Sequence, residues 1–364
     1  MTLSGPVMPL YVKSLGIGPV QWGALASAWA LGMFLLEWVW GGLSDTRDGR
    51  PLLAISALCM SVVYFLFTVH ALIPLFIVLE FVSGAVGVAV GPMTRAYVSA
   101  ESPGKSIGLF ASLWWSSFML GQVIGPVVGS FVAQTWSFQS SFYASAILSI
   151  ALAFFALCLF PKHKELRRKN DGTNLVSGLR SVLGLRSVRL LFLSTVLIFI
   201  GRSLVITFLP LYASSVIGMS TLQVGILVAL VSALELVSMP ALGWLSDRFG
   251  LKHTAVLSYG FSATLLLLYF LAKTIYQVFL ISIALGIGLS GLFLLLALMR
   301  TVTPSGTYGR AMGAYGSCED LGIMIGPIIY GFVWSAYGPV YIFFVGCLVQ
   351  LFAAFLILRV KQRS

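Results

Sequence analysis

The sequence predicts an all-α polytopic membrane protein, and three observations carry this prediction. Of the 364 residues, 59% are hydrophobic and only 9% are charged, whereas soluble domains average about 25% charged residues. Apolar runs close to the roughly 20 residues that a helix needs to cross a bilayer recur from end to end. Landmark residues also recur at a constant spacing of 201 or 202 positions. Such a chain is not an ordinary soluble enzyme, a secreted disulfide scaffold or a disordered regulator.

Proline, glycine and charged residues punctuate the apolar pattern and define the expected helices. A short apolar piece occupies 1–15, and a polar segment from Pro161 to Arg189 divides the chain. The domains expected are an N-terminal bundle over 1–160, a central linker over 161–188 and a C-terminal bundle over 189–364. Helices are expected near 21–43, 52–71, 74–98, 106–133, 139–160, 189–213, 221–245, 253–272, 275–300, 310–335 and 338–359.

The two bundles have the sequence pattern of an internal repeat. The tripeptide PLY contains Pro9 in the first half and Pro210 in the second, and Asp45 recurs as Asp247. Parallel repeats related by an axis along the membrane normal belong to one class of secondary transporter. Further pairs in the same order are Gln21 and Gln223, Gly23 and Gly225, Pro103 and Pro304, and Gly121 and Gly322.

The first helix is shorter than its counterpart. Only eight residues precede Pro9, and a helix of that size reaches about 12 Å across a hydrocarbon core of about 30 Å. We therefore expect twelve spanning helices, the first of them truncated here, with a native start upstream of Met1. The alternative is an eleven-helix protein with a partial first helix.

The basic residues predict the orientation in the membrane. Nineteen of the 22 Lys and Arg fall in the breaks after every second helix, and only Lys13 and Lys273 fall in the opposite breaks. Because basic loops stay on the cytoplasmic side, these loops and the linker are expected in the cytoplasm of a cell-membrane protein. The net charge of +11 thus reflects topology and not nucleic-acid binding. The basic run 162–172 is a topology determinant, with binding of anionic lipid as the alternative.

Two polar motifs end corresponding helices. GGLSDTRDGR covers 41–50 and GWLSDRFGLK covers 243–252; with the six-plus-six repeat they resemble the GxLaDrxGrr loop of the major facilitator superfamily, a resemblance that spans essentially the whole chain. It implies two six-helix bundles and a latch that favours the outward-facing state. The first copy has an extra residue before Gly49, which puts Arg47 and Arg50 out of the usual pattern. The residues carried over are Gly41, Asp45, Arg47, Arg50, Gly243, Asp247, Arg248, Gly250 and Lys252.

A second pair of motifs marks the fifth and eleventh helices. GQVIGPVVGS (121–130) and GIMIGPIIYG (322–331) resemble the GxxxGPxxGG element of exporters in this family. Glycines spaced by four leave a smooth stripe for close helix packing, and proline removes a backbone hydrogen bond and permits a kink. The alternative is ordinary close packing with no bearing on direction. The residues are Gly121, Gly125, Pro126, Gly129, Gly322, Gly326 and Pro327.

Ionisable residues inside the helices are the candidate coupling groups, since charges in a bilayer are costly and usually functional. Glu235 lies twelve residues before Asp247 and Arg202 eight before Pro210, so the two should share one depth and form an ion pair. A carboxyl in an apolar interior can load and release a proton near neutral pH. The alternative is an acid that is paired or protonated for packing only. The other candidates are Asp320, Glu319, Glu80 and Glu37.

Glu80 departs from the family pattern. Proton-coupled exporters that this chain resembles usually carry Arg in an RxxxG element of the fourth helix, but here the stretch reads EFVSG. The loss of this arginine weakens a direct transfer of the family's proton mechanism. An acid at this place is a candidate site for a cation or a proton.

The function expected is secondary active transport by alternating access, with proton-coupled export of small hydrophobic or cationic compounds. Metabolite uptake by symport, or a membrane sensor that lost transport, are the alternatives. No enzyme motif such as HExxH or GxSxG occurs in a fitting context, and the four cysteines lie singly, so no catalysis, cofactor or metal is expected. The partners expected are a small-molecule substrate, protons and the bilayer, with no nucleic acid, for a monomer.

Overall fold

The computed structural model describes residues 2–69, 72–94, 107–158, 184–303 and 308–361. Within these ranges eleven helices are long and apolar enough to cross a membrane, so the predicted polytopic all-α class is confirmed. The chain divides into two compact units. The first unit comprises Met1–Asn170 with Ser220–Ala229, and the second comprises Asp171–Met219 with Leu230–Ser364. The linker predicted over 161–188 falls almost entirely outside the described residues.

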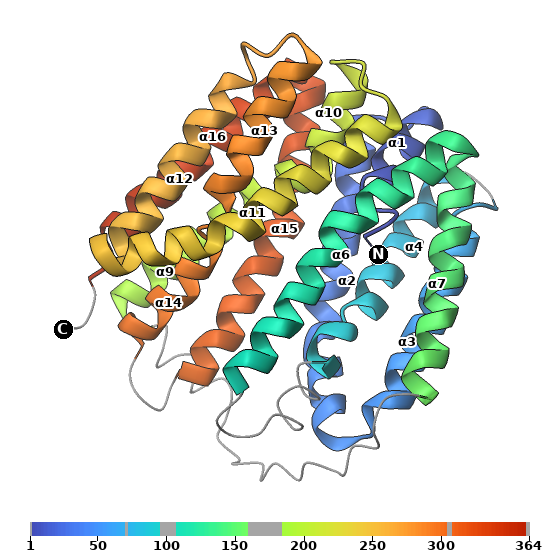
Figure 1. Ribbon diagram of the computed structural model, residues 1–364, viewed down its shortest axis with the longest axis horizontal. Helices are drawn as coiled ribbons and strands as arrows, with labels where there is room; N and C mark the ends of the chain where they lie inside the picture. Colours follow the sequence, from blue (N-terminus) through green and yellow to red (C-terminus); the bar gives the residue numbers. More distant parts are fainter. Residues whose placement is uncertain (1, 70–71, 95–106, 159–183, 304–307, 362–364) are drawn as a thin grey trace. The chain divides into compact units, whose positions relative to one another are not determined.

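The first unit begins with α1, the short apolar piece (Figure 1). Helices α2 and α4 carry a proline in the first turn, where its missing N–H costs no hydrogen bond. Helix α3 packs along α7 and α2 packs along α4. The helices of this unit are α1 (Val7–Ser14), α2 (Pro19–Thr46), α3 (Gly49–Leu66), α4 (Ile73–Gly87), α6 (Ile107–Thr135) and α7 (Phe138–Cys158).

The second unit follows the same order, with α15 and α16 both packed against α9. Its helices are α9 (Arg186–Ser203), α10 (Leu209–Ser215), α11 (Thr221–Phe249), α12 (Leu251–Leu268), α13 (Ile275–Leu289), α14 (Leu292–Val302), α15 (Tyr308–Tyr337) and α16 (Tyr341–Leu358). The first nine residues of α11 belong to the first unit.

Two of the predicted helices of the second unit are interrupted. The helix expected over 189–213 contains a π-helical stretch, Leu204–Phe208, between α9 and α10. Pro210 follows this stretch, and its ring would clash with the carbonyl of Ile206 in a regular α-helix, so a wider turn relieves the strain. The helix expected over 275–300 is divided into α13 and α14 at Ser290 and Gly291.

Close helix crossings recur in both units at the predicted spacing. At Gly84 on α4 a Cβ atom would overlap the backbone carbonyl of Trp29 on α2, and at Gly286 on α13 a Cβ atom would lie 2.5 Å from the carbonyl oxygen of Val231 on α11. Both glycines and both carbonyls are related by an offset of 202. The two crossings therefore have the same construction, and only glycine permits them.

Hydrogen bonds between neighbouring helices repeat in the same way. The Ser56 hydroxyl on α3 donates to the carbonyl of Val86 on α4 at 2.9 Å. The Ser258 hydroxyl on α12 donates to the carbonyl of Gly288 on α13 at 2.6 Å. These partners are again 202 residues apart, so the sequence repeat corresponds to a repeat of contacts within each unit.

An aromatic cluster completes the correspondence. The rings of Tyr11 and Phe142 lie 5.2 Å apart, and those of Tyr212 and Phe343 lie 4.8 Å apart. Each cluster has a third ring from the end of a corresponding helix. This ring is Phe67 after α3 in the first unit and Tyr269 after α12 in the second.

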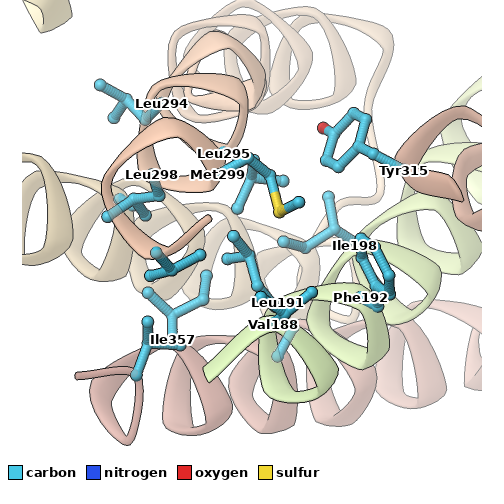
Figure 2. Packing of buried hydrophobic residues seen from close by; sticks show 14 of the residues in the cluster. Val188, Leu191, Phe192, Ile198, Leu294, Leu295, Leu298, Met299, Tyr315 and Ile357 are labelled. Atoms are coloured by element: carbon cyan, nitrogen blue, oxygen red, sulfur yellow. The ribbon is translucent and has the colours of Figure 1, made fainter. Parts of the chain in front are cut away.

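The largest apolar core of the second unit lies where α9, α14, α15 and α16 meet (Figure 2). Leu191 and Ile198 of α9 face Leu295 and Met299 of α14, and Tyr315 of α15 stands beside them. All of these side chains are at most 2% exposed. This core fixes α9 and α15 next to each other, and both helices carry candidate coupling residues.

Candidate functional site

The ion pair predicted between Arg202 and Glu235 is present in the second unit. Nη1 of Arg202 donates to Oε1 of Glu235 at 2.8 Å, and Nη2 donates to Oε2 at 3.2 Å. The side chains are 19% and 5% exposed, respectively. Two parallel hydrogen bonds between a guanidinium and a carboxylate give the strongest and most directional geometry for such a pair. The π-helical stretch of the chain begins two residues after Arg202.

Three more polar side chains surround this pair. Glu319 of α15 and Tyr259 of α12 both interact electrostatically with Arg202, and Tyr315 interacts with both Glu319 and Tyr259. We call these five residues the polar cluster. It holds two carboxyl groups against one guanidinium, so its acidic groups outnumber its basic group.

Two hydroxyl groups of the polar cluster are buried. Tyr259 and Tyr315 are 0% and 2% exposed; the Tyr315 side chain is hydrogen-bonded to Glu319, whereas the Tyr259 hydroxyl has no hydrogen-bond partner within the described residues. A buried hydroxyl without a partner costs on the order of 1–3 kcal/mol. Neither tyrosine is marked by a sequence motif; the one signal is the helical spacing of four residues that places Tyr315 on the same face as Glu319.

The two neighbouring acidic side chains on α15, Glu319 and Asp320, point in different directions. Successive helical residues point about 100° apart, and the structure brings Glu319 into the polar cluster. Asp320 is buried, with 8% exposure. The side chain of Glu319 is half-buried, so these two predicted coupling residues differ in exposure.

Glycines on α15 bring its acidic residue next to α9. A Cβ atom at Gly322 would lie 2.6 Å from the carbonyl oxygen of Val196, and one at Gly326 would overlap the hydroxyl of Ser203. Gly322 follows Glu319 by one turn, and Ser203 follows Arg202 directly. The glycine stripe predicted in this helix thus positions the polar cluster.

The first-unit copy of this stripe packs in the equivalent way. A Cβ atom at Gly125 would overlap the Thr2 side chain, and one at Gly129 would overlap the carbonyl of Leu3. Thr2 and Gly125 correspond to Ser203 and Gly326 at an offset of 201. Pro126 and Pro327 both lie inside their helices.

Glu80 is the buried acid of the first unit. It is 8% exposed on α4, and the Ser83 hydroxyl donates to its backbone carbonyl at 2.8 Å and lies 3.4 Å from Oε2 of its carboxyl. Tyr64 of α3 interacts with it electrostatically. The equivalent residue of the second unit is Ser282, so the acid is specific to the first. Glu37, also a predicted coupling residue, is partly exposed on α2.

The first copy of the loop motif contains a local ion pair. Asp48 precedes α3, accepts a hydrogen bond from the backbone N–H of Arg50 at 3.1 Å and pairs with its guanidinium at 2.6 Å. Asp48, the residue that departs from the family pattern, thus caps α3 and pairs with Arg50 of the motif. Arg47 is exposed, and the side chain of Asp45 lies outside the described part of the structure.

The second copy makes its turn with glycine. Gly250 has φ +87°, a conformation that glycine adopts without strain, and Lys252 Nζ donates to the carbonyl of Val360 at 3.0 Å. The guanidinium of Arg248 lies 5.7 Å from the ring centre of Trp244. Asp247 is exposed. The basic side chains Arg248 and Lys252 therefore have partners close to the turn.

The repeated apolar units and the buried ionisable groups together define a multi-pass membrane transporter. A family model described as Major Facilitator Superfamily matches residues 1–191 and again residues 191–364. The chain belongs to this family, as the two loop motifs predicted.

Relatives and solved structures are similar along nearly the whole chain. "Multidrug resistance protein MdtG" of Rahnella sp. (strain Y9602) is 27% identical over 96% of this chain and 87% of its own length, and the MdtG protein of Serratia proteamaculans (strain 568) is 28% identical over the same shares. The crystal structure of a mutant of the nucleoside transporter NupG has a TM-score of 0.81 at 15% identity, covering 99% of this chain and 96% of its own. A bacterial homolog to human lysosomal transporter Spinster has a TM-score of 0.79 at 13% identity, covering 100% of this chain and 94% of its own.

Proposed function

We propose that this transporter exports small hydrophobic or cationic compounds in exchange for protons. The observation that carries the proposal is the polar cluster of the second unit, where two carboxyl groups and one arginine lie in membrane-spanning helices. The names of the MdtG relatives and the GxxxGP elements of α6 and α15 support the outward direction.

Exchange follows from competition for the same carboxyl groups. A carboxylate that binds a proton is neutral and attracts a cation less, and a carboxylate that binds a cation takes up a proton less readily. In the proposed cycle the N-terminal bundle over 1–160 and the C-terminal bundle over 189–364 rock about the site as a monomer, with the basic loops in the cytoplasm. Each opening then exposes the acids to one side.

The proposal is tested by neutralising single acids. Glu235→Gln and Asp320→Asn are each expected to abolish proton-driven flux of ethidium in proteoliposomes, because the amide cannot carry the proton. The glutamine at 235 keeps an oxygen that accepts from Arg202, so this variant should remain folded. Ethidium movement under an imposed pH gradient and thermal unfolding of the purified protein are the measurements.

Three results would count against the proposal. Unchanged flux in both single variants and in the double variant would remove these acids from coupling. Inward accumulation of substrate with the proton gradient would favour uptake by symport. Binding of ethidium without any flux in the wild-type protein would favour a sensor.

Glu80 is proposed as a coupling acid of the first unit. Glu80→Gln is expected to lower proton-driven flux, while exchange of labelled for unlabelled substrate without a pH gradient continues, because only the proton step needs the carboxyl group. Ser282→Ala changes the equivalent position of the second unit and should retain proton-driven flux. Equal flux in the wild-type and Glu80→Gln proteins would show that this acid has a packing role.

A further inference from the structure

Three helix ends of the second unit are held together by hydrogen bonds. The Lys252 ammonium near the start of α12 donates to the carbonyl of Val360, after α16, at 3.0 Å. The Ser187 hydroxyl near the start of α9 donates to the carbonyl of Lys361 at 3.0 Å and accepts from its N–H at 3.3 Å. These bonds fix the starts of α9 and α12 against the end of α16.

The side chains at these three helix ends are strongly basic. We call them the basic rim, and its members are Arg186 and Arg189 of α9, Lys252 of α12, and Arg359 and Lys361 after α16. All but Lys252 are exposed, and among the described residues none of the five forms an ion pair. At this end of the unit the described residues include one carboxylate, Asp247. Positive charge therefore exceeds negative charge at the rim.

The basic rim lies where membrane-spanning segments begin and end. The apolar spans of α9 and α12 start at Arg186 and Leu251, and that of α16 ends at Leu358. The Arg359 guanidinium lies 5.0 Å from the centre of the Phe355 ring, which is exposed. Aromatic rings and long basic side chains at the ends of spanning helices lie at the depth of the lipid headgroups.

The helix surfaces that lead away from the rim are apolar. Helix α16 packs along α12, and both helices expose large apolar side chains. On α16 the rings of Phe352 and Phe355 lie 6.4 Å apart, and α12 exposes Leu257 and Phe261. Positive charge at the end and apolar surface along the length match the two parts of an anionic phospholipid.

The equivalent positions of the first unit do not carry this free charge. Arg50 is the counterpart of Lys252 at an offset of 202, and its guanidinium pairs with Asp48. Cys158 is the counterpart of Arg359 at an offset of 201. Membrane topology requires basic residues in loops on one side and does not require them at one set of helix ends. The rim is therefore more than a copy of the repeated scaffold.

We propose that the basic rim binds the phosphate group of an anionic phospholipid, with the acyl chains along the exposed faces of α12 and α16. A guanidinium such as that of Arg359 binds a phosphate through two parallel hydrogen bonds. The Lys252 ammonium keeps two further N–H donors beside the one that it gives to Val360. A lipid bound there bridges the three helix ends and stabilises the second unit.

The test measures lipid binding to the purified full chain by native mass spectrometry, which resolves each bound lipid. The probes are a phosphatidylglycerol and a phosphatidylcholine with the same acyl chains. Phosphatidylglycerol is expected to bind about tenfold more tightly or better, because basic groups attract the anionic headgroup and not the zwitterionic one. Inorganic phosphate at equal concentration should not displace it, because phosphate lacks the acyl chains.

Removal of single charges from the rim should weaken this binding. Arg359→Gln and Lys361→Gln are each expected to lower the affinity for phosphatidylglycerol about fivefold and to leave that for phosphatidylcholine unchanged. Arg359→Lys keeps the charge and should stay within about twofold of the wild-type protein. Both glutamine variants should remain folded, because the side chains are exposed and Ser187 bonds only the backbone of Lys361. Thermal unfolding checks this.

Lys273→Gln is the matched control for Lys361→Gln. Lys273 is exposed and lies between α12 and α13, at the opposite end of α12 from Lys252. The substitution removes the same charge from the chain, and phosphatidylglycerol should bind this variant as it binds the wild-type protein.

Equal affinity of the wild-type protein for the two phospholipids would overturn the proposal. So would Arg359→Gln and Lys361→Gln variants that bind phosphatidylglycerol as Lys273→Gln does. Displacement of phosphatidylglycerol by inorganic phosphate at equal concentration would show a site for a free anion in place of a lipid site. None of these outcomes depends on the direction or the coupling of transport.

Discussion

Replacement of Arg202 by methionine should destabilise the folded protein by about 3–5 kcal/mol, because it leaves the buried carboxylate of Glu235 without its cation. Glu235 is 5% exposed, and both of its carboxylate oxygens accept hydrogen bonds from Arg202, so the substitution leaves two buried acceptors without their donors. The measurement is thermal unfolding of the protein purified in detergent. The melting temperature of Arg202→Met should fall well below that of the wild-type protein.

The double variant Arg202→Met/Glu235→Leu separates stability from function. Apolar residues of similar volume often replace a buried ion pair with little loss or even a gain, so the melting temperature should recover. Proton-driven flux should stay absent, because the carboxyl group is gone. A double variant as unstable as Arg202→Met would show that the lost pair is not the cause of the instability. One that transports like the wild-type protein would show that the pair serves packing only.

Gly84→Ala should separate α2 from α4 and leave little folded protein. The added methyl would overlap the carbonyl oxygen of Trp29, which is backbone and cannot turn away as a side chain does. Overpacking of a close-packed interior costs about 1–3 kcal/mol and occasionally more, and this collision falls at the upper end. The gain in helix propensity from alanine, at most about 1 kcal/mol, does not offset it. The yield of monodisperse protein and its melting temperature are the measurements.

Gly260→Ala is the matched control for this substitution. Gly260 lies inside α12, and nothing lies within 4 Å of the Cβ atom that alanine would add there. This variant should therefore fold at least as well as the wild-type protein. A loss at Gly260 as large as at Gly84 would mean that the helix crossing is not what makes Gly84 necessary.

The sequence predicted the architecture because bilayer physics leaves few choices. Backbone groups in hydrocarbon must bond within their own helix, so apolar runs and their breaks locate the spanning segments to within a few residues. The Arg202–Glu235 pair was also predictable from helix geometry. Arg202 lies eight residues before Pro210 and Glu235 lies twelve before Asp247, and the known rise per residue places the two side chains at similar positions along their helices. Which residues of neighbouring helices lie side by side is thus readable from spacing.

Other features depend on contacts that spacing does not reveal. Tyr259 joins the polar cluster because α12 turns that face inward, and a lone tyrosine in an apolar run carries no such signal. The partner of Arg50 is Asp48, the residue that departs from the loop pattern. Only the backbone conformation of the turn shows that Asp48 caps a helix. The π-helical stretch before Pro210 is likewise a steric adjustment that hydropathy does not show.

The two halves share their interior contacts but differ in their ionisable groups. They are therefore equivalent as scaffolds, whereas their candidate coupling residues are not equivalent. Residue 33, at an offset of 202 from Glu235, is methionine. A chimera assembled from two N-terminal halves would inherit the glycine crossings and aromatic trios yet lack the guanidinium–carboxylate bridge. The repeat thus supplies the frame twice, and the Arg202–Glu235 pair belongs to the second copy.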